Sequence, residues 1–274
     1  MGSEASVVSE RRVSQEVARA ARVDRLVVAH RGASAHEAEN TLPAFEAAIA
    51  AGADVVELDV RMTADDVAVV MHDADVSRTT DGTGLVRDLA LADLKELRIR
   101  TADGGGTEVP TLEEALVCLS GRAAVDVEIK NIPGEPDFDP GRELAVESTL
   151  RALASVGFEG LALVSSFNPL SIARARELSP DIPTGLLTTE DVEARVALGF
   201  AHGQGHAWVL PFTGAVLAAG PSLAEEAHEL GMRLGTWITD DPVVAIGLMR
   251  AGVDAVATND PATVVAARRE VFGG

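Results

Sequence analysis

Two carboxylates, Glu57 and Asp59, stand two positions apart in the mostly apolar run Asp54–Val60. On a β-strand, residues at i and i+2 point to the same face. Two acidic side chains on one buried face are costly unless a positive charge binds them. Ligands that are all oxygen favour Mg²⁺ or Ca²⁺ over Zn²⁺, so the pair indicates a hard-cation site. An acidic pair held by a nearby cation such as Arg61 is the alternative.

The same spacing recurs in the segment Asp126–Lys130, where Glu128 and Lys130 share one face of an expected strand. Glu128 offers a third carboxylate ligand. Lys130 is suited to hold a phosphate or to pair with Glu128. A buried ion pair without any ligand explains this pattern equally well.

Histidines end two further apolar runs. His30 and Arg31 follow Leu26–Ala29, and His72 ends the run that begins at Val67. In barrel enzymes the active site forms at the carboxyl ends of the strands. The planar guanidinium of Arg31 matches the geometry of a phosphate. Two histidines, three carboxylates and two cations at one rim would suit phosphodiester cleavage, whereas a zinc site is disfavoured because carboxylates dominate the set.

The elements that must position these residues are short apolar runs that alternate with amphipathic segments. Continuous apolar runs are typical of strands that are buried on both faces of a parallel sheet. The expected strands are Leu26–His30, Asp54–Val60, Ala124–Ile129, Leu161–Ser165, Pro183–Leu187, Ala207–Leu210, Arg233–Ile238 and Asp254–Ala257. The expected helices are Thr41–Ala51, Leu112–Leu119, Pro140–Val156, Asn168–Leu178, Glu190–Leu198, Ser222–Leu230, Asp241–Arg250 and Asp260–Arg269. Eight strand–helix units predict an α/β fold of the (β/α)₈ TIM-barrel type. A doubly wound sheet is the alternative, but the first strand is not followed by its glycine-rich fingerprint.

A short hairpin and loop insertion is expected after the second strand. The run from Val67 lies close behind Asp54–Val60, which predicts two antiparallel strands. If Ala64 and Asp65 form the turn, His72 lies opposite Glu57. The interval Asp75–Thr111 then becomes an excursion with a short helix at Asp93–Leu97.

Length and charge limit the possible functions. The chain has 274 residues, 47% of them hydrophobic, and a formal net charge of −20. We expect a polar tail over residues 1–24 and one domain over 25–274. The negative charge argues against nucleic acid and anionic membranes as partners. No apolar run reaches the ~18 residues of a membrane span. A single cysteine, Cys118, cannot form an internal disulfide, which indicates a reducing, cytoplasmic location or a fold that needs no disulfide.

The combined pattern resembles the glycerophosphodiester phosphodiesterase family between about Leu26 and Ala262. The matching segments are His30–Ser34, Glu39–Thr41, Glu57–Val60, His72–Asp73, Glu128–Lys130, Ser166–Asn168, Thr236–Trp237, Gly252–Asp254 and Asp260–Pro261. Some positions depart from the family pattern. Ala38 replaces a proline, Leu210–Pro211 replaces a His-Pro pair, Ile238–Asp240 stands where Thr-Val-Asn is common, and Asn259 replaces an acidic residue.

The resemblance implies hydrolysis of small glycerophosphodiesters to sn-glycerol 3-phosphate and an alcohol, within lipid and glycerol metabolism. It implies a divalent cation, Mg²⁺ or Ca²⁺, on Glu57, Asp59 and Glu128, and a general acid/base pair in His30 and His72. Arg31 and Lys130 would bind the phosphate. In the family's usual mechanism, a substrate hydroxyl attacks phosphorus and water opens the resulting cyclic phosphate. The order of the two histidines is left open.

Asn40, Phe167 and Trp237 are also expected to contact the substrate. Trp237 would form an apolar wall, although barrel packing explains it as well. Phe167 would line the same pocket, or it could equally be an aromatic residue of the core. A phospholipase acting on intact lipid would need an apolar or basic surface that faces the membrane. The charge of −20 and the 3% aromatic content disfavour this alternative. A non-catalytic phosphate-binding barrel would lack a histidine or a carboxylate, and none is missing. Neither the head group nor the oligomeric state is predicted.

Overall fold

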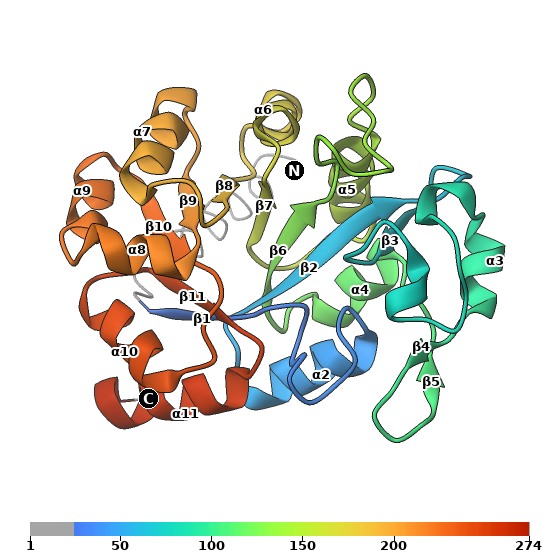
Figure 1. Cartoon of the computed structure of the whole chain (residues 1–274), viewed down its shortest axis with the longest axis horizontal. Coiled ribbons are helices and arrows are strands. Elements are labelled where there is room, and N and C mark those ends of the chain that lie inside the picture. Colours follow the sequence, from blue (N-terminus) through green and yellow to red (C-terminus); the bar gives the residue numbers. More distant parts are fainter. Residues whose placement is uncertain (1–24, 274) are drawn as a thin grey trace, which may run out of the picture.

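Eight parallel strands close into a barrel in the computed structural model, which describes residues 25–273 (Figure 1). In chain order the strands are β1 (Leu26–Ala29), β2 (Val55–Met62), β6 (Ala124–Ile129), β7 (Ala162–Ser166), β8 (Thr184–Thr188), β9 (Trp208–Pro211), β10 (Arg233–Thr236) and β11 (Ala255–Thr258). Each strand pairs with its neighbour in this order, and β1 pairs with both β2 and β11, which closes the ring. The predicted TIM barrel is confirmed, and each predicted strand is found within two residues of its expected ends.

Helices surround the barrel (Figure 1). They are α2 (Leu42–Ala51), α4 (Leu112–Leu119), α5 (Leu144–Ser155), α6 (Pro169–Leu178), α7 (Ala194–Gln204), α8 (Thr213–Ala219), α9 (Leu223–Glu229), α10 (Pro242–Arg250) and α11 (Pro261–Phe272). Three of these helices begin where the sequence predicts. Helices α6, α10 and α11 each start with a proline, and the residue before it, Asn168, Asp241 or Asp260, caps the helix with its side chain.

One predicted helix was misplaced at both ends, and one helix was missed. The helix expected at Glu190–Leu198 runs instead as α7 to Gln204 and passes through Gly199. It ends at Gly205, whose φ of 75° supplies the left-handed cap. Helix α8 was not predicted. Its seven residues begin directly after β9, and no side chain caps its amino end.

The insertion after β2 is present, but its predicted register was off by one residue. Strand β3 (Ala68–Val70) pairs antiparallel with β2, with Val60 opposite Val70. The turn spans five residues rather than two, because Thr63 bonds Val67 through both its backbone N–H and its hydroxyl, and Asp66 adopts a φ of 60°. Since β3 ends at Val70, His72 does not pair with Glu57 but follows the strand in a loop.

The excursion after β3 contains η1 (Val76–Arg78), η2 (Val86–Asp88), α3 (Leu91–Glu96), β4 (Ile99–Arg100) and β5 (Gly106–Thr107), at the side of the barrel in Figure 1. It has its own small apolar core around Val69, Leu94 and Val109. This packing fixes the excursion against β3 and therefore the loop that carries His72.

The barrel core places β2 and β6 side by side in a defined register. Glu57 lies beside Asp126, and Asp59 lies beside Glu128. Between these strands and the helices, Phe45, Leu58 and Leu116 are fully buried. Because side chains alternate along a strand, this outer packing turns the neighbouring acidic residues toward the barrel axis. Among residues 25–273, no helix combines the length and the apolar character that a membrane crossing needs.

Candidate active site

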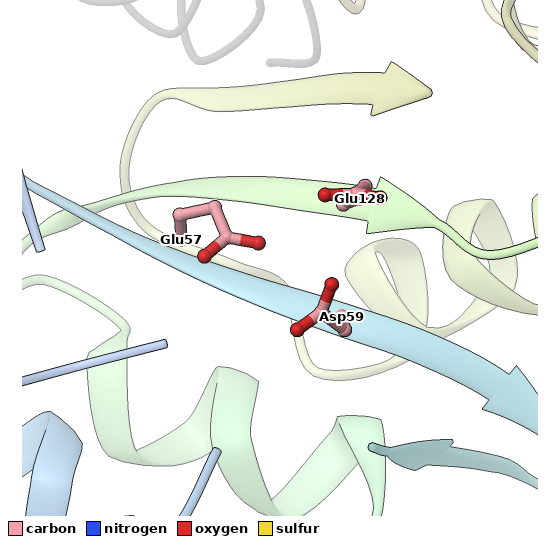
Figure 2. Close-up of side chains that lie close together, drawn as sticks. All are labelled: Glu57, Asp59 and Glu128. Carbon is pink, nitrogen blue, oxygen red and sulfur yellow. The ribbon is translucent and has the colours of Figure 1, made fainter. Parts of the chain in front are cut away.

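Three buried carboxylates meet at one edge of the barrel. Ligand oxygens of Glu57, Asp59 and Glu128 all lie within 4.8 Å of one another. Figure 2 shows Glu57 and Asp59 on β2, with Glu128 beside them on β6. The three residues are 6%, 0% and 6% exposed. The predicted acidic set is therefore brought together by the pairing of two adjacent strands.

The protein holds one oxygen of each carboxylate by a hydrogen bond. The backbone N–H of Arg31 donates to Glu57 Oε2 at 2.8 Å, Asn40 Nδ2 donates to Asp59 Oδ2 at 2.7 Å, and Lys130 Nζ donates to Glu128 Oε1 at 2.7 Å. Glu57 Oε1 and Asp59 Oδ1 are buried without a hydrogen-bond partner. Buried, unpartnered oxygens from anionic side chains are the donors that a hard divalent cation takes, so the residues present fit Mg²⁺ or Ca²⁺.

The electrostatics of the cluster point the same way. Burial, together with the charges of Asp59 and Glu128, raises the pKa of Glu57 well above its usual value. Burial also raises the pKa of Glu128. Burial would raise the pKa of Asp59 too, but Lys130 and Arg31 outweigh it and hold that pKa below its ordinary value. The site thus concentrates negative charge that a bound cation would relieve.

The two predicted phosphate-binding cations flank this cluster. Arg31 Nε lies 3.2 Å from Asp59 Oδ2, and Lys130 Nζ lies 3.6 Å from Asp59 Oδ1. Arg31 follows β1 with a φ of 56°, and Gly32 continues the turn with a φ of 83°. A Cβ at Gly32 would stand 2.7 Å from Ala44, so only glycine lets the turn pack against α2.

Arg61 is not the partner of the acidic pair. Its side chain donates to the carbonyl oxygen of His72 at 2.8 Å and forms ion pairs with Glu135 and Asp137. It is 2% exposed. The alternative in which Arg61 neutralises Glu57 and Asp59 is therefore wrong, and Arg61 instead joins β2 to the loops that follow β3 and β6.

Both histidines border one cavity of about 140 Å³ at the end of the barrel. Its lining also includes Arg31, Lys130, Glu57, Glu128, Phe167 and Trp237. His30 Nδ1 lies 2.9 Å from Asn259 Oδ1, and His72 Nδ1 lies 2.6 Å from Asp73 Oδ1. Burial first, and Arg31 next, lower the pKa of His30 to about 4. Burial likewise lowers the pKa of His72, against the opposing charge of Asp59.

The aromatic residues form one wall of this cavity. Phe167 and Trp237 meet edge to face with ring centroids 5.2 Å apart, and Phe212 meets Trp237 in the same way at 5.6 Å. The Trp237 indole N–H donates to the carbonyl oxygen of Leu210. These contacts fix the ring planes and agree with the packing role expected for Trp237, whereas its contact with substrate remains a prediction.

Asn40 lies elsewhere. It is 2% exposed, stands behind Asp59 and is absent from the cavity lining. Its amide oxygen also accepts from the backbone N–H of Asp59 at 3.3 Å. Its expected contact with substrate remains a prediction, and the contact present is with a candidate metal ligand.

Two hydrogen-bond networks behind the histidines were missed. Glu39 accepts from both Arg31 and Arg78, and Arg78 also binds Asp73, the partner of His72. The adjacency of His72 and Asp73 in the sequence was a signal for this pairing. No pattern pointed to Arg78, because it enters from the irregular excursion. The second network, around Asn259, is formed by residues far apart in the chain.

Comparison with known proteins agrees with this geometry. Residues 30–263 match the glycerophosphoryl diester phosphodiesterase family. A glycerophosphodiester phosphodiesterase of Caldanaerobacter subterraneus is 34% identical over 246 residues, which cover 88% of this chain and 96% of that protein. A phosphodiesterase of Oleispira antarctica, solved in complex with the product sn-glycerol-3-phosphate, shares 26% identity with a TM-score of 0.79 and covers 90% of this chain and 98% of its own. A glycerophosphodiester phosphodiesterase of Thermotoga maritima shares 25% identity, with a TM-score of 0.71, and covers 88% and 97%.

Proposed function

The chain belongs to the glycerophosphoryl diester phosphodiesterase family, and we propose that it hydrolyses small glycerophosphodiesters to sn-glycerol 3-phosphate and an alcohol, with Mg²⁺ or Ca²⁺ as the cofactor. The observation that carries the proposal is the convergence of two histidines, two cations, Glu57 and Glu128 on one cavity, with Asp59 clustered beside the two glutamates. The product named for the Oleispira antarctica relative supports the glycerol phosphate side of the reaction.

Glu57, Asp59 and Glu128 would hold the cation, which supplies a Lewis acid for a phosphoryl oxygen when it is bound. Arg31 and Lys130 flank the acidic cluster and would bind the remaining phosphate charge. The pocket thus offers positive groups where negative charge grows as the phosphorus is attacked. Lys130 is buried and Arg31 is half-buried, so little water screens these interactions.

His30 and His72 would act as the acid/base pair. One imidazole takes the proton from the substrate's glycerol hydroxyl, whose oxygen attacks phosphorus. The bond from phosphorus to the leaving alcohol breaks, and the other imidazole donates a proton to that oxygen. Water then opens the cyclic phosphate with the two roles reversed. Groups of this kind typically contribute about 10² to 10⁴ in rate each.

The cavity, of about 140 Å³, also offers the substrate contacts beyond its phosphate. The aromatic wall of Phe167 and Trp237 would contact the carbon skeleton of the glycerol or of the alcohol. We further propose that residues 25–274 form one catalytic domain and that the enzyme acts in the cytoplasm, without nucleic acid or a stable membrane partner.

The test measures release of glycerol 3-phosphate from a panel of glycerophosphodiesters, with choline, ethanolamine, glycerol and inositol as head groups. We expect turnover that stops after exhaustive chelation and returns with Mg²⁺ or Ca²⁺. His30→Ala and His72→Ala should each lower kcat by about 10² or more, while Arg87→Ala, which changes an exposed side chain of the excursion after β3, serves as a folded control. Full activity after chelation would remove the metal from the proposal. If the enzyme hydrolysed lysophospholipid but none of the glycerophosphodiesters in the panel, the proposed substrate class would be wrong.

A further inference from the structure

Asn259 connects His30 to a carboxylate that does not touch the cavity. Three loops meet here, since His30 follows β1, Asp240 follows β10 and Asn259 follows β11. Asn259 Oδ1 lies 2.9 Å from His30 Nδ1 and 3.0 Å from Ser34 Oγ. On its other side, Asn259 Nδ2 lies 2.9 Å from Asp240 Oδ2, and its backbone N–H donates to Asp240 Oδ1 at 2.7 Å.

Asp240 determines which way the Asn259 amide points. Burial would raise the pKa of Asp240, but hydrogen bonds from Asn259 and from the Thr258 hydroxyl outweigh it and lower that pKa. Asp240 is therefore ionised at neutral pH and can only accept hydrogen bonds. The amide must present its NH₂ group to Asp240, because the reversed amide would place two oxygen atoms against each other. The amide oxygen consequently faces His30.

The amide oxygen in turn determines the tautomer of His30. It has no hydrogen to donate, so the hydrogen between it and the ring must sit on Nδ1 of His30. In a neutral imidazole the other nitrogen, Nε2, then carries the lone pair. His30 borders the cavity, so this lone pair is the one available to a bound substrate.

The surroundings keep His30 neutral. The charged and titratable groups that act on its ring are Arg31 in its own loop, Asp59 on β2 and His72 after β3. Burial and Arg31 disfavour the imidazolium, and the neutral amide of Asn259 opposes them only in part. At His72 the carboxylate of Asp73 faces Nδ1 and favours a protonated ring, but burial, Lys130 and Arg31 outweigh it and lower the pKa of this histidine as well.

We propose that Asn259, oriented by Asp240, is a positioning residue that holds His30 as the neutral Nδ1–H tautomer. This inference rests on the proposed function and adds to it the ring nitrogen, Nε2, through which His30 would exchange a proton with the substrate.

The tautomer can be read without any turnover. The protein labelled with ¹⁵N at histidine reports the protonation of each ring nitrogen by NMR, and the His30 signals are assigned from their loss in His30→Gln. We expect a protonated Nδ1 and an unprotonated Nε2 at pH 7. An Nε2–H ring at this pH would overturn the proposal, whatever the enzyme's activity.

Variants at Asn259 separate a positioning role from a packing role. Asn259→Leu keeps the size of the side chain but offers no acceptor, so we expect a mixture of tautomers and a fall in kcat of about tenfold or more with KM little changed. The exchanged pair Asn259→Asp/Asp240→Asn restores an acceptor at Nδ1. It should restore the tautomer and move the acidic limb of kcat/KM upward by about 1 to 3 pH units, because a carboxylate now faces the ring.

Asp241→Asn is the matched control. It removes one negative charge from the adjacent position and keeps a residue able to cap α10, so its pH profile should follow the wild type. If the exchanged pair leaves the acidic limb in place, or if Asn259→Leu keeps the wild-type tautomer and kcat, the positioning role is refuted. A correct tautomer in a protein that hydrolyses no glycerophosphodiester would instead refute the proposed function.

Discussion

Asp59 gives one carboxylate oxygen to a hydrogen bond with the protein and leaves the other without one, and Asn40 determines which oxygen is which. The amide of Asn40 both donates to Asp59 Oδ2 and accepts from the Asp59 backbone. It can do so because Asn40 adopts a φ of 59°, a conformation that asparagine tolerates better than most residues. Groups that orient metal ligands are important for metal affinity even though they never touch the ion.

We therefore expect Asn40→Ala to weaken metal binding by about 10- to 100-fold. Titration of activity against Mg²⁺ and Ca²⁺ measures the effect, and calorimetry checks it without substrate. At saturating metal, KM for glycerophosphocholine should return to near the wild-type value. A KM that stays high at saturating metal would instead assign Asn40 to substrate binding, the role expected from the sequence.

The lowered pKa of His30 should make the stability of the protein depend on pH. A folded-state pKa of about 4, against 6.5 in the unfolded chain, means that the unfolded chain binds more protons between these values. Stability should therefore fall as the pH drops from 6.5 toward 4, by at most about 3 kcal/mol from this residue. Urea unfolding at pH 7 and pH 5 measures the loss, which should be smaller in His30→Gln. An equal loss in both proteins would show that other groups carry the acid sensitivity.

At the scale of elements, the sequence predicted best what is repetitive. All eight barrel strands were located because each is a short apolar run, and Pro or Gly residues marked most helix ends. Gly199 was misread as an end because a glycine inside a helix costs only about 1 kcal/mol, which the surrounding packing offsets. The hairpin register was missed because it depends on the side-chain bonds of Thr63, which no periodicity reports.

The positions of site residues were likewise predictable only where those residues lie on regular strands. Residues on regular strands, such as Glu57 and Glu128, have neighbours that the strand order alone determines. Residues that enter from irregular segments, such as Arg78 and Asn259, have partners that depend on loop paths. The pairing of Arg78 with Asp73 joins residues five positions apart, but its second partner, Glu39, is 39 positions away.

The excursion should therefore affect catalysis through Arg78. This arginine binds Glu39 and Asp73 together and thereby connects the loop of Arg31 to that of His72. Arg78→Ala should lower kcat/KM by about 10- to 100-fold, because small displacements of reacting groups lower the rate strongly. Arg78→Lys should recover part of the loss. Arg87→Ala, an exposed arginine of the same excursion, is the control in the same phosphodiesterase assay. An unchanged kcat/KM in Arg78→Ala would show that His72 needs no support from the excursion.

For the molecule as a whole, the net charge of −20 opposes the approach of an anionic substrate. Salt shortens the range of this repulsion, from about 10 Å at 0.1 M to about 3 Å at 1 M. We expect kcat/KM for glycerophosphoglycerol, which carries a net negative charge, to rise by about twofold or more between low and moderate salt. Glycerophosphocholine, which is neutral overall, is the comparison and should respond less. Equal responses to NaCl would show that the surface charge does not act on encounter.

The barrel closes where β1 meets β11, and this seam also joins His30 to Asn259. During synthesis, His30 is made early, but Asn259, which orients its ring, is made only near the end of the chain. We therefore expect an incomplete chain to be inactive until β11 has been made and has paired with β1.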